Sequence, residues 1–438
     1  MSDALERFYD GLDNNVVLRD ANNRPSVFVK HHKVSSNTFD PSATFTVGGV
    51  EYPCLPDHTH PAFIVNGVED PALLIGKYQS VELTPKGTQY SLPNAVPAPV
   101  YNYATNLSAM RAFGQNVSGM TIADHGLMVL MAHKNKWITY GNNRGGNDYR
   151  DGNSSPAWSS SSSTAYSVGV TVIFRGYLYE CIKEHTSSSS TSPLIDREHW
   201  KKLRKTGGTP VAERIGSSDA SSAKTVLTGS GPANWYFGHD LANEADIGGN
   251  GDAWLYGALI RYGELWILPN NDAADPNADL STSSDQWRAI KPCEPTESNG
   301  YTNYMLVSTG GTDTIHFVYT NKLMITDREL TSTEQSAGEK TAYFKDLTFE
   351  PSSVNLTNYG IPTILYELGL YPLPGTTVDG RMDIGFSSSY ICLSFGRNFT
   401  QGAIQGIASY RCMSTSSSDI GASDRIYFST RPRARVLA

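Results

Sequence analysis

The sequence predicts an α+β fold that is rich in strands and loops. Only 18% of its 438 residues are charged, whereas glycine occurs 39 times and tyrosine 24 times. This composition is typical of a surface that offers hydroxyl groups, amides and aromatic rings rather than charges. Short apolar runs with β-sheet alternation are separated by glycine, asparagine and aspartate, which indicates strands joined by turns. Helical spacing is confined to two segments, near residues 107–113 and 121–137.

The first part of the chain is predicted to contain mostly strands. Residues 1–58 are expected to form a short N-terminal β element for attachment or oligomerisation, with strands at 15–19 and 26–30. These segments alternate apolar and polar residues, as half-buried strands do. The runs 61–70 and 73–78 then predict a pair of strands at the start of the main domain, whose first part we place at residues 59–153.

Two helices are expected to follow these strands. Leu107, Met110 and Phe113 recur at a spacing of three residues, which predicts one buried helix face. The second helix is predicted to begin near Thr121, because Thr121 and Asp124 have the spacing of a capping arrangement. It is apolar on most sides and therefore expected in the core. The turn-dense segment 140–149 is expected to expose several side chains.

Residues 154–206 are predicted to be an inserted module with serine- and glycine-rich linkers. A strand, a glycine turn and a second strand within 165–181, followed by Trp200, predict a three-stranded sheet. The order of its aromatic residues and its His-Thr-Ser turn at 185–187 resembles small carbohydrate-binding modules of bacterial chitinases and of phage tail proteins. The resemblance implies a sugar site with the aromatic candidates Trp158, Tyr177 and Trp200. The alternative is that the aromatic residues, Tyr166 and Tyr179 above all, form the core of so small a domain.

Residues 207–438 are interpreted as the second part of the main domain. The runs 252–261 and 264–268 flank a Tyr-Gly turn and predict a hairpin. The blocks 249–254 and 268–274 resemble those of the formylglycine-generating branch of the C-type lectin-like fold and of phage tail proteins with that fold. Residues 396–402 and Arg431-Pro432 lie where proteins of this family have a Gly-Gly-x-Trp-x-x-Gly block and a Gly-Phe-Arg-Pro block. The resemblance covers roughly residues 60–438 and implies a C-type lectin-like fold with the module as an insertion.

The resemblance also implies a function. In such tail proteins, the segment after the glycine-rich block presents the side chains that contact the receptor, and in some systems a retroelement diversifies it. The ligand-binding residues implied here are Asn398, Phe399, Thr400, Gln401, Ala403, Ile404, Ser409, Arg411 and Met413. The expectation is a receptor-binding protein of a phage tail or tail fibre, made in the host cytoplasm and located in the virion. Its partners would be a host-cell surface protein or glycan and other tail proteins.

The resemblance also implies a homotrimer, because tail fibres commonly have threefold symmetry and multivalency strengthens weak single-site binding. Catalysis is not expected, since a formylglycine-generating oxidase needs a pair of reactive cysteines near the C-terminus. Only Cys412 lies there, and no cysteine follows it. The alternatives that remain are a structural tail or baseplate role without receptor contact and, third, such an oxidase.

No cofactor is expected, although calcium is an open alternative. His58 and His60 are separated by one residue and have no evident third metal ligand. Several acidic residues after the predicted hairpin carry oxygen atoms that suit calcium, but a turn-forming loop is the favoured interpretation: Asp272, Asp275, Asp279 and Asp285.

The overall charge and the cysteines exclude several other classes of protein. A net charge of −8 argues against nucleic-acid binding, and the arginines of the segment 431–435 are expected to bond neighbouring backbone or carboxylates. Five dispersed cysteines predict reduced, mostly buried thiols rather than a disulfide framework. No apolar run reaches the roughly 20 residues of a membrane helix, so membrane insertion is not expected.

Overall fold

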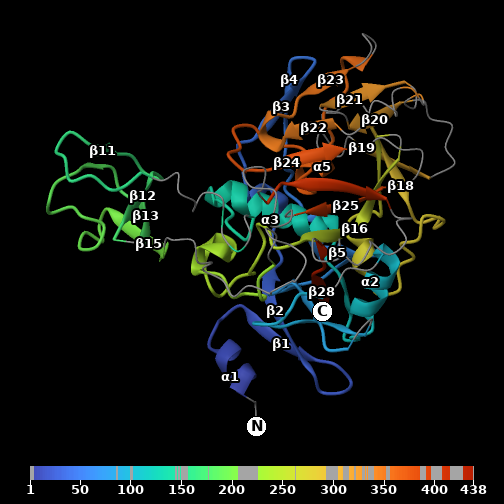
Figure 1. Ribbon diagram of the computed structural model, residues 1–438. Coiled ribbons are helices and arrows are strands. Elements are labelled where there is room, and N and C mark those ends of the chain that lie inside the picture. Colours follow the sequence, from blue (N-terminus) through green and yellow to red (C-terminus); the bar gives the residue numbers. More distant parts are fainter. Residues whose placement is uncertain are drawn as a thin grey trace.

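The computed structural model describes residues 4–84, 87–98, 102–143, 146, 148, 156–175, 177–205, 225–261, 263–292, 304–308, 315–319, 322–327, 331, 333, 340–351, 356–384, 391–395, 407–414 and 428–437. Figure 1 shows a large main body and, at its side, a small module drawn in green. The α-helices of the described chain are α1 (Ala4–Asp10), α2 (Tyr103–Arg111), α3 (Ile122–Asn135) and α5 (Thr363–Glu367). The strand-rich α+β class is confirmed.

Helix α3 begins with the cap that the sequence predicts. The Thr121 side chain accepts a hydrogen bond from the Asp124 amide, and the Asp124 carboxylate accepts one from the Thr121 amide. These reciprocal bonds satisfy amides that a helix N-terminus otherwise leaves without partners. The prediction of a buried face on α2 is confirmed for Leu107 and Met110, whereas Phe113 is buried but lies just after the end of the helix.

A first sheet joins both ends of the chain. Its strands, in spatial order, are β1 (Asn15–Arg19), β2 (Pro25–His32), β7 (Ala72–Gly76), β28 (Pro432–Val436) and β10 (Val117–Gly119). Strand β7 is buried along its whole length, and it pairs with β2 on one side and β28 on the other. The predicted strands at 15–19 and 26–30 are confirmed. They belong to this sheet of the main body and do not form a separate N-terminal element.

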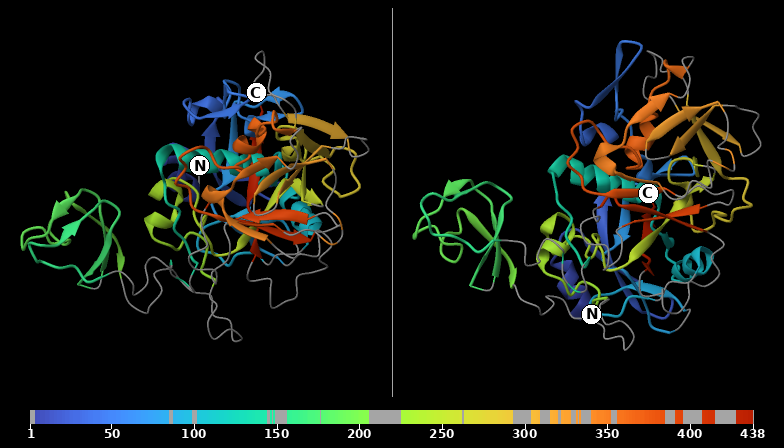
Figure 2. Two further views of the ribbon diagram at one scale, coloured as in Figure 1. Left: turned by 90° about the horizontal axis from the view of Figure 1, so that it is seen from above. Right: turned by 45° about the horizontal axis from the view of Figure 1, so that its top comes forward.

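A second, larger sheet carries the rest of the main body. In spatial order it contains β22 (Lys340–Tyr343), β24 (Arg381–Ile384), β26 (Tyr410–Ser414), β25 (Ile391–Phe395), β16 (Asp252–Arg261), β17 (Glu264–Ile267), β20 (His316–Tyr319), β21 (Leu323–Thr326) and β23 (Phe349–Pro351). Strands β18 (Arg288–Pro292), β19 (Tyr304–Ser308) and β27 (Phe428–Ser429) attach beside this row. The β16–β17 hairpin confirms the predicted one. Figure 2 shows this sheet from two further directions.

Short hairpins complete the main body. They are β3 (Thr44–Val47) with β4 (Val50–Pro53), β5 (Ile64–Val65) with β6 (Val68–Glu69), and β8 (Ser80–Glu82) with β9 (Gln89–Ser91). The turn of the β5–β6 hairpin consists of Asn66 and Gly67, which both have positive φ. Such an Asn-Gly pair tolerates the left-handed backbone that a two-residue hairpin requires.

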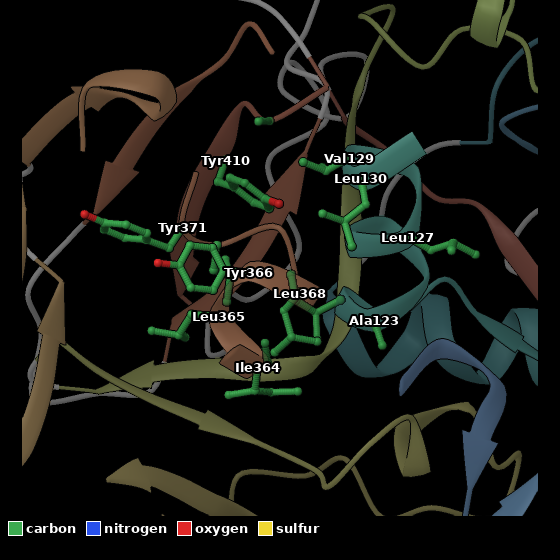
Figure 3. Packing of buried hydrophobic residues seen from close by; sticks show 14 of the residues in the cluster. Ala123, Leu127, Val129, Leu130, Ile364, Leu365, Tyr366, Leu368, Tyr371 and Tyr410 are labelled. Carbon is green, nitrogen blue, oxygen red and sulfur yellow. The ribbon is translucent and has the colours of Figure 1, made fainter. Parts of the chain in front are cut away.

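One hydrophobic core connects the two sheets with helices α3 and α5. Figure 3 shows side chains of α3 facing those of α5 and Tyr410 across this core. A Cβ atom on Gly126 would lie 2.1 Å from the Glu367 carbonyl oxygen. Helix α3 can therefore approach the end of α5 this closely only because position 126 has no side chain.

The inserted module has the predicted three-stranded sheet. It consists of β12 (Thr171–Phe174), β13 (Tyr177–Cys181) and β15 (Trp200–Lys205), with β11 (Ala165–Tyr166) and β14 (His185–Thr186) forming a second pair. Its small core contains Tyr166 and Tyr179, as the core interpretation of these residues predicted. The module stands apart from the main body in every view (Figures 1 and 2).

The expectation that segment 140–149 exposes several side chains is wrong for its described residues. Tyr140, Asn142, Asn143 and Asp148 are buried. The Asn142 amide donates to the Asn250 side chain, and the Asn143 amide donates to the Asp148 carboxylate. Because these polar groups satisfy one another, a turn-rich sequence becomes part of the interior.

The prediction of reduced, buried thiols is confirmed for Cys54 and Cys181, the two cysteines whose state the structure describes. Burial raises the pKa of Cys54 to about 12, so this thiol stays protonated at neutral pH. Among the described residues, no helix has the length and apolar character needed to cross a membrane.

Candidate functional site

The connection between strands β25 and β26, residues 396–409, starts and ends on firmly held backbone. Phe395 and Tyr410 lie opposite each other in the antiparallel pair and are both buried. Strand β25 also pairs with β16, and β26 pairs with β24. A loop anchored in this way on a rigid sheet can present side chains in a defined place. We call Phe395 and residues 407–410 the loop base.

Most of the predicted ligand-binding residues belong to this connection. Six of them lie outside the described residues, and their role stays a prediction: Asn398, Phe399, Thr400, Gln401, Ala403 and Ile404. Arg411 and Met413 lie on β26, where their backbones pair with Ser394 and Cys392. The structure therefore brings these two residues to the strand that leaves the loop.

Ser409 does not have the exposure that a receptor contact needs. It is fully buried, and its hydroxyl oxygen accepts a hydrogen bond from the Arg381 amide. A Cβ atom on Gly380 would lie 2.2 Å from the Ala408 carbonyl carbon, so the chain before β24 touches the loop base at backbone level. The prediction of an exposed Ser409 is wrong because this close contact covers the residue.

His125 of helix α3 supports the loop base from inside the core. Its Nδ1 lies 3.0 Å from the Tyr410 hydroxyl, which donates a hydrogen bond of 2.7 Å to the Gly369 carbonyl. The imidazole ring also packs against Phe395, with ring centroids 4.3 Å apart. One side chain of α3 thus contacts both ends of the connection. Figure 3 shows Tyr410 directed toward this helix.

Burial fixes the charge state of this support. Desolvation lowers the pKa of His125 to about 3, so the imidazole is neutral at physiological pH. Desolvation also raises the pKa of Tyr410 above its ordinary value. A neutral imidazole and a protonated phenol form the hydrogen bond between them without placing a charge in the core.

The pH dependence of stability follows from this neutral histidine. An unfolded histidine binds a proton near pH 6.5, whereas folded His125 does not, so stability is lost as the pH falls below 6.5. At pH 4.5 the loss should be about 3 kcal/mol, from about 1.4 kcal/mol per pH unit. Urea denaturation at pH 7 and 4.5 should show a smaller decrease for His125→Gln than for the unchanged chain. Equal decreases would contradict a neutral, buried His125.

Three arginines hold the last described segment of the chain: Arg431, which precedes strand β28, and Arg433 and Arg435 on that strand. Arg433 bonds both carboxylate oxygens of Asp124 at 3.2 and 3.3 Å, and both side chains are fully buried. Arg435 binds Asp70 through two hydrogen bonds of 2.8 Å. Arg431 donates to the carbonyl oxygens of residues 76 and 245. The prediction that these arginines bond backbone and carboxylates is confirmed.

In the module, Trp200 cannot serve as a sugar platform. It is only 2% exposed, and its Nε1 donates to the Thr191 carbonyl. Its ring packs edge-on against Tyr166 and His185. The prediction for Trp200 is therefore wrong, because a module this small needs its largest side chain as its core.

The other two aromatic candidates of the module are partly exposed. Trp158 packs edge-on against Phe174 with ring centroids 4.9 Å apart. The ammonium group of Lys202 lies 3.5 Å from the centre of the Tyr177 ring and covers one of its faces. Since Phe174 and Tyr177 are opposite each other in the β12–β13 pair, the structure brings all three aromatic rings together. Sugar binding by Trp158 and Tyr177 stays a prediction.

The two histidines considered as metal ligands converge on one residue of α5. The His58 Nε2 lies 2.5 Å from a Glu367 carboxylate oxygen, which also accepts the Ser36 hydroxyl. His60 bonds the Glu367 carbonyl through Nε2 and accepts the Ala62 amide through Nδ1. Both nitrogens of His60 are occupied by these contacts, which fasten segment 58–62 to α5.

The acidic segment after β17 forms turns. The Asp272 and Asp275 carboxylates accept hydrogen bonds from Asn66, and Asp275 also accepts the Asn277 amide. Asp279 accepts the Ser281 amide in the same manner. The bonds to Asn277 and Ser281 confirm the turn-forming interpretation for Asp275 and Asp279, whereas the Asp272 carboxylate holds the distant residue Asn66. Within the described part of the chain, no group of three or more histidine, cysteine, aspartate or glutamate residues is placed to hold a metal ion.

Sequence reasoning missed the residues that hold the loop base, namely His125, Gly369 and Gly380. His125 occurs within an ordinary helical pattern, and nothing local indicates its contact with a strand almost 300 residues later. Gly369 offered a weak signal, because a glycine in the sequence can mark a left-handed backbone position. In the structure Gly369 does have a positive φ of 65°.

Comparison with known proteins adds no family to this description. No family model matches the chain, and a search of curated proteins finds no significant relative.

Proposed function

We propose that the chain is a receptor-binding protein of a phage tail or tail fibre, with a C-type lectin-like main domain whose connection 396–409 contacts a host-cell surface protein or glycan. The observation that carries this proposal is the loop base. Two paired strands fix both ends of the connection, and His125 supports both ends from within the core. Rigid support of this kind lowers the entropy that binding costs.

The place of the last strand in the first sheet also supports the lectin-like assignment. Strand β28 pairs with β7, so segments from both ends of the sequence share one sheet while the intervening chain forms the second sheet. The proposal places the protein in the virion as a homotrimer that contacts other tail proteins.

The test is adsorption of the purified full chain to bacterial cells. The chain is labelled with a fluorophore and applied to a panel of strains, and a strain that binds it is then used for variants. Replacing Asn398, Gln401 and Arg411 together by alanine should reduce the bound fraction at least about tenfold, which corresponds to about 1.4 kcal/mol. Interface truncations commonly cost this much at the centre of a site.

A matched control replaces the exposed residues Asn22 and Lys33, far from β26 in sequence, by alanine. This control should adsorb like the unchanged chain. If the triple variant keeps its fold by circular dichroism and binds as before, the assignment of the connection as the contact site is refuted. If the unchanged chain binds no strain of the panel, the receptor-binding proposal loses its support.

A further inference from the structure

A recess of about 420 Å³ lies between strand β2, the segment after it and the last turns of helix α3. Small-molecule sites typically measure about 300–1,000 Å³, so this space fits one sugar ring with its substituents. From α3 it is lined by Leu127, Met131, Lys134 and Asn135, and no residue of the loop base is among its lining residues.

The inner wall of the recess is apolar. Phe39 and Leu127 are buried parts of the main core, and Met131 packs against that core while staying partly exposed. A ligand with one apolar face gains by covering such a surface. The wall thus suits a ring with C–H groups on one side more than a bare inorganic ion.

The titratable residues that line the recess are all of the basic kind, namely Lys30, His31, His32 and Lys134. No aspartate or glutamate is among its lining residues. The chain as a whole has a net charge of −8, so this concentration of basic residues differs from the average composition. A concave site with charges of one sign attracts ligands of the opposite sign.

Two of these basic side chains have fixed positions. The His31 Nε2 lies 2.6 Å from a carboxylate oxygen of fully buried Glu244. Desolvation lowers the pKa of His31, but the charge and the hydrogen bond of Glu244 together with the charge of Asp124 outweigh it, so the pKa is raised overall. The Lys134 ammonium donates to the Thr38 carbonyl at 2.8 Å. Since an ammonium has three donors, this single bond leaves Lys134 able to donate to a ligand.

Amide groups supply polar contacts on another side. Asn14, Asn135 and Asn243 line the recess, and the Asn14 amide donates to the Asn243 side chain at 3.0 Å. Side-chain amides both donate and accept hydrogen bonds, as sugar hydroxyl groups do. The apolar wall, the basic residues and the amides together suit a ligand that has a ring, hydroxyl groups and a negative charge.

We propose that this recess binds a carboxylate-bearing sugar, with its carboxylate at Lys134 and His31 and its ring on Phe39 and Met131. This site is additional to the receptor contact proposed for the connection 396–409 and does not depend on it. A uronic acid is the simplest ligand of this class.

The probe is glucuronate, titrated into the full chain and followed by isothermal calorimetry. Binding should saturate, and glucose, which lacks the carboxylate, should bind at least about tenfold more weakly because it cannot make the charge-assisted hydrogen bonds. Acetate, which lacks the ring, should also bind more weakly. Lys134→Gln should weaken glucuronate binding about tenfold.

The matched control is Lys33→Gln, which removes an exposed lysine that pairs with Glu69. It should leave glucuronate binding unchanged, as should Gln401→Ala in the connection. The proposal is refuted if glucuronate does not bind saturably, if glucose binds equally well, or if Lys33→Gln weakens binding as much as Lys134→Gln. Loss of adsorption in the connection variants with glucuronate binding intact would separate this site from the proposed receptor contact.

Discussion

Replacing Asp124 with alanine is expected to lower the free energy of unfolding by about 3–5 kcal/mol. Its carboxylate caps α3 through the Thr121 amide, accepts the Asn271 amide and pairs with Arg433. Without it, the Arg433 guanidinium stays buried as a charge without its counter-ion, which is far costlier than the loss of one neutral hydrogen bond. Urea denaturation at pH 7 measures the change.

Two further variants test whether the buried charge of Arg433 causes this loss of stability. Glu69→Ala removes a carboxylate from the exposed pair with Lys33 and should change stability far less than Asp124→Ala does, because solvent screens such a pair. Combining Asp124→Ala with Arg433→Met removes both charges, so the double variant should be more stable than Asp124→Ala alone. If the double variant is less stable than Asp124→Ala, the buried charge of Arg433 is not the main cause of the lost stability.

Replacing Tyr410 with alanine is expected to cost about 3–5 kcal/mol, the usual range for truncating a large buried aromatic side chain. The ring fills core space beside α3 (Figure 3), and its hydroxyl joins His125 to the Gly369 carbonyl. Truncation leaves a cavity and removes the hydrogen-bond partner of the His125 imidazole and of the Gly369 carbonyl. Because Tyr410 begins β26, cell adsorption should fall together with stability.

Tyr343→Ala is the matched control, since Tyr343 lies on β22 of the same sheet and is 53% exposed. Its effect should stay within about 0.5 kcal/mol. Tyr410→Phe keeps the ring and should cost about 1–3 kcal/mol through the lost hydrogen bonds. If Tyr410→Ala is no more destabilising than Tyr343→Ala, the loop base is not held as described.

Local features of this fold could be predicted from the sequence, because each depends on neighbouring residues. The capping box at Thr121 and Asp124 is contained within four positions, and the β16–β17 hairpin within one turn. The alternation at 15–19 likewise requires no knowledge of the partner strand. For the same reason, the arginines of β28 could be assigned to carboxylates in general, but not to Asp124 and Asp70 in particular.

Features that depend on distant partners could not be predicted. The turn-rich residues Asn142 and Asn143 resemble a surface loop until Asn250 and Asp148 are placed beside them. Trp200 has the same local pattern whether it faces a sugar or the core of its module. Ser409 is buried by the backbone at Gly380, and no local pattern indicates that approach.

The pairing of β28 with β7 also affects how the chain is made. The Arg431 side chain and its partner, the Gly76 carbonyl, are separated by 355 positions in the sequence. At a translation rate of about 5–20 residues per second, roughly 20–70 seconds pass between the synthesis of the two strands. During this time one edge of the apolar strand β7 lacks its neighbour and can pair with other chains. Slower translation or crowding of nascent copies should therefore reduce the yield of folded protein more than it changes the stability of molecules already folded.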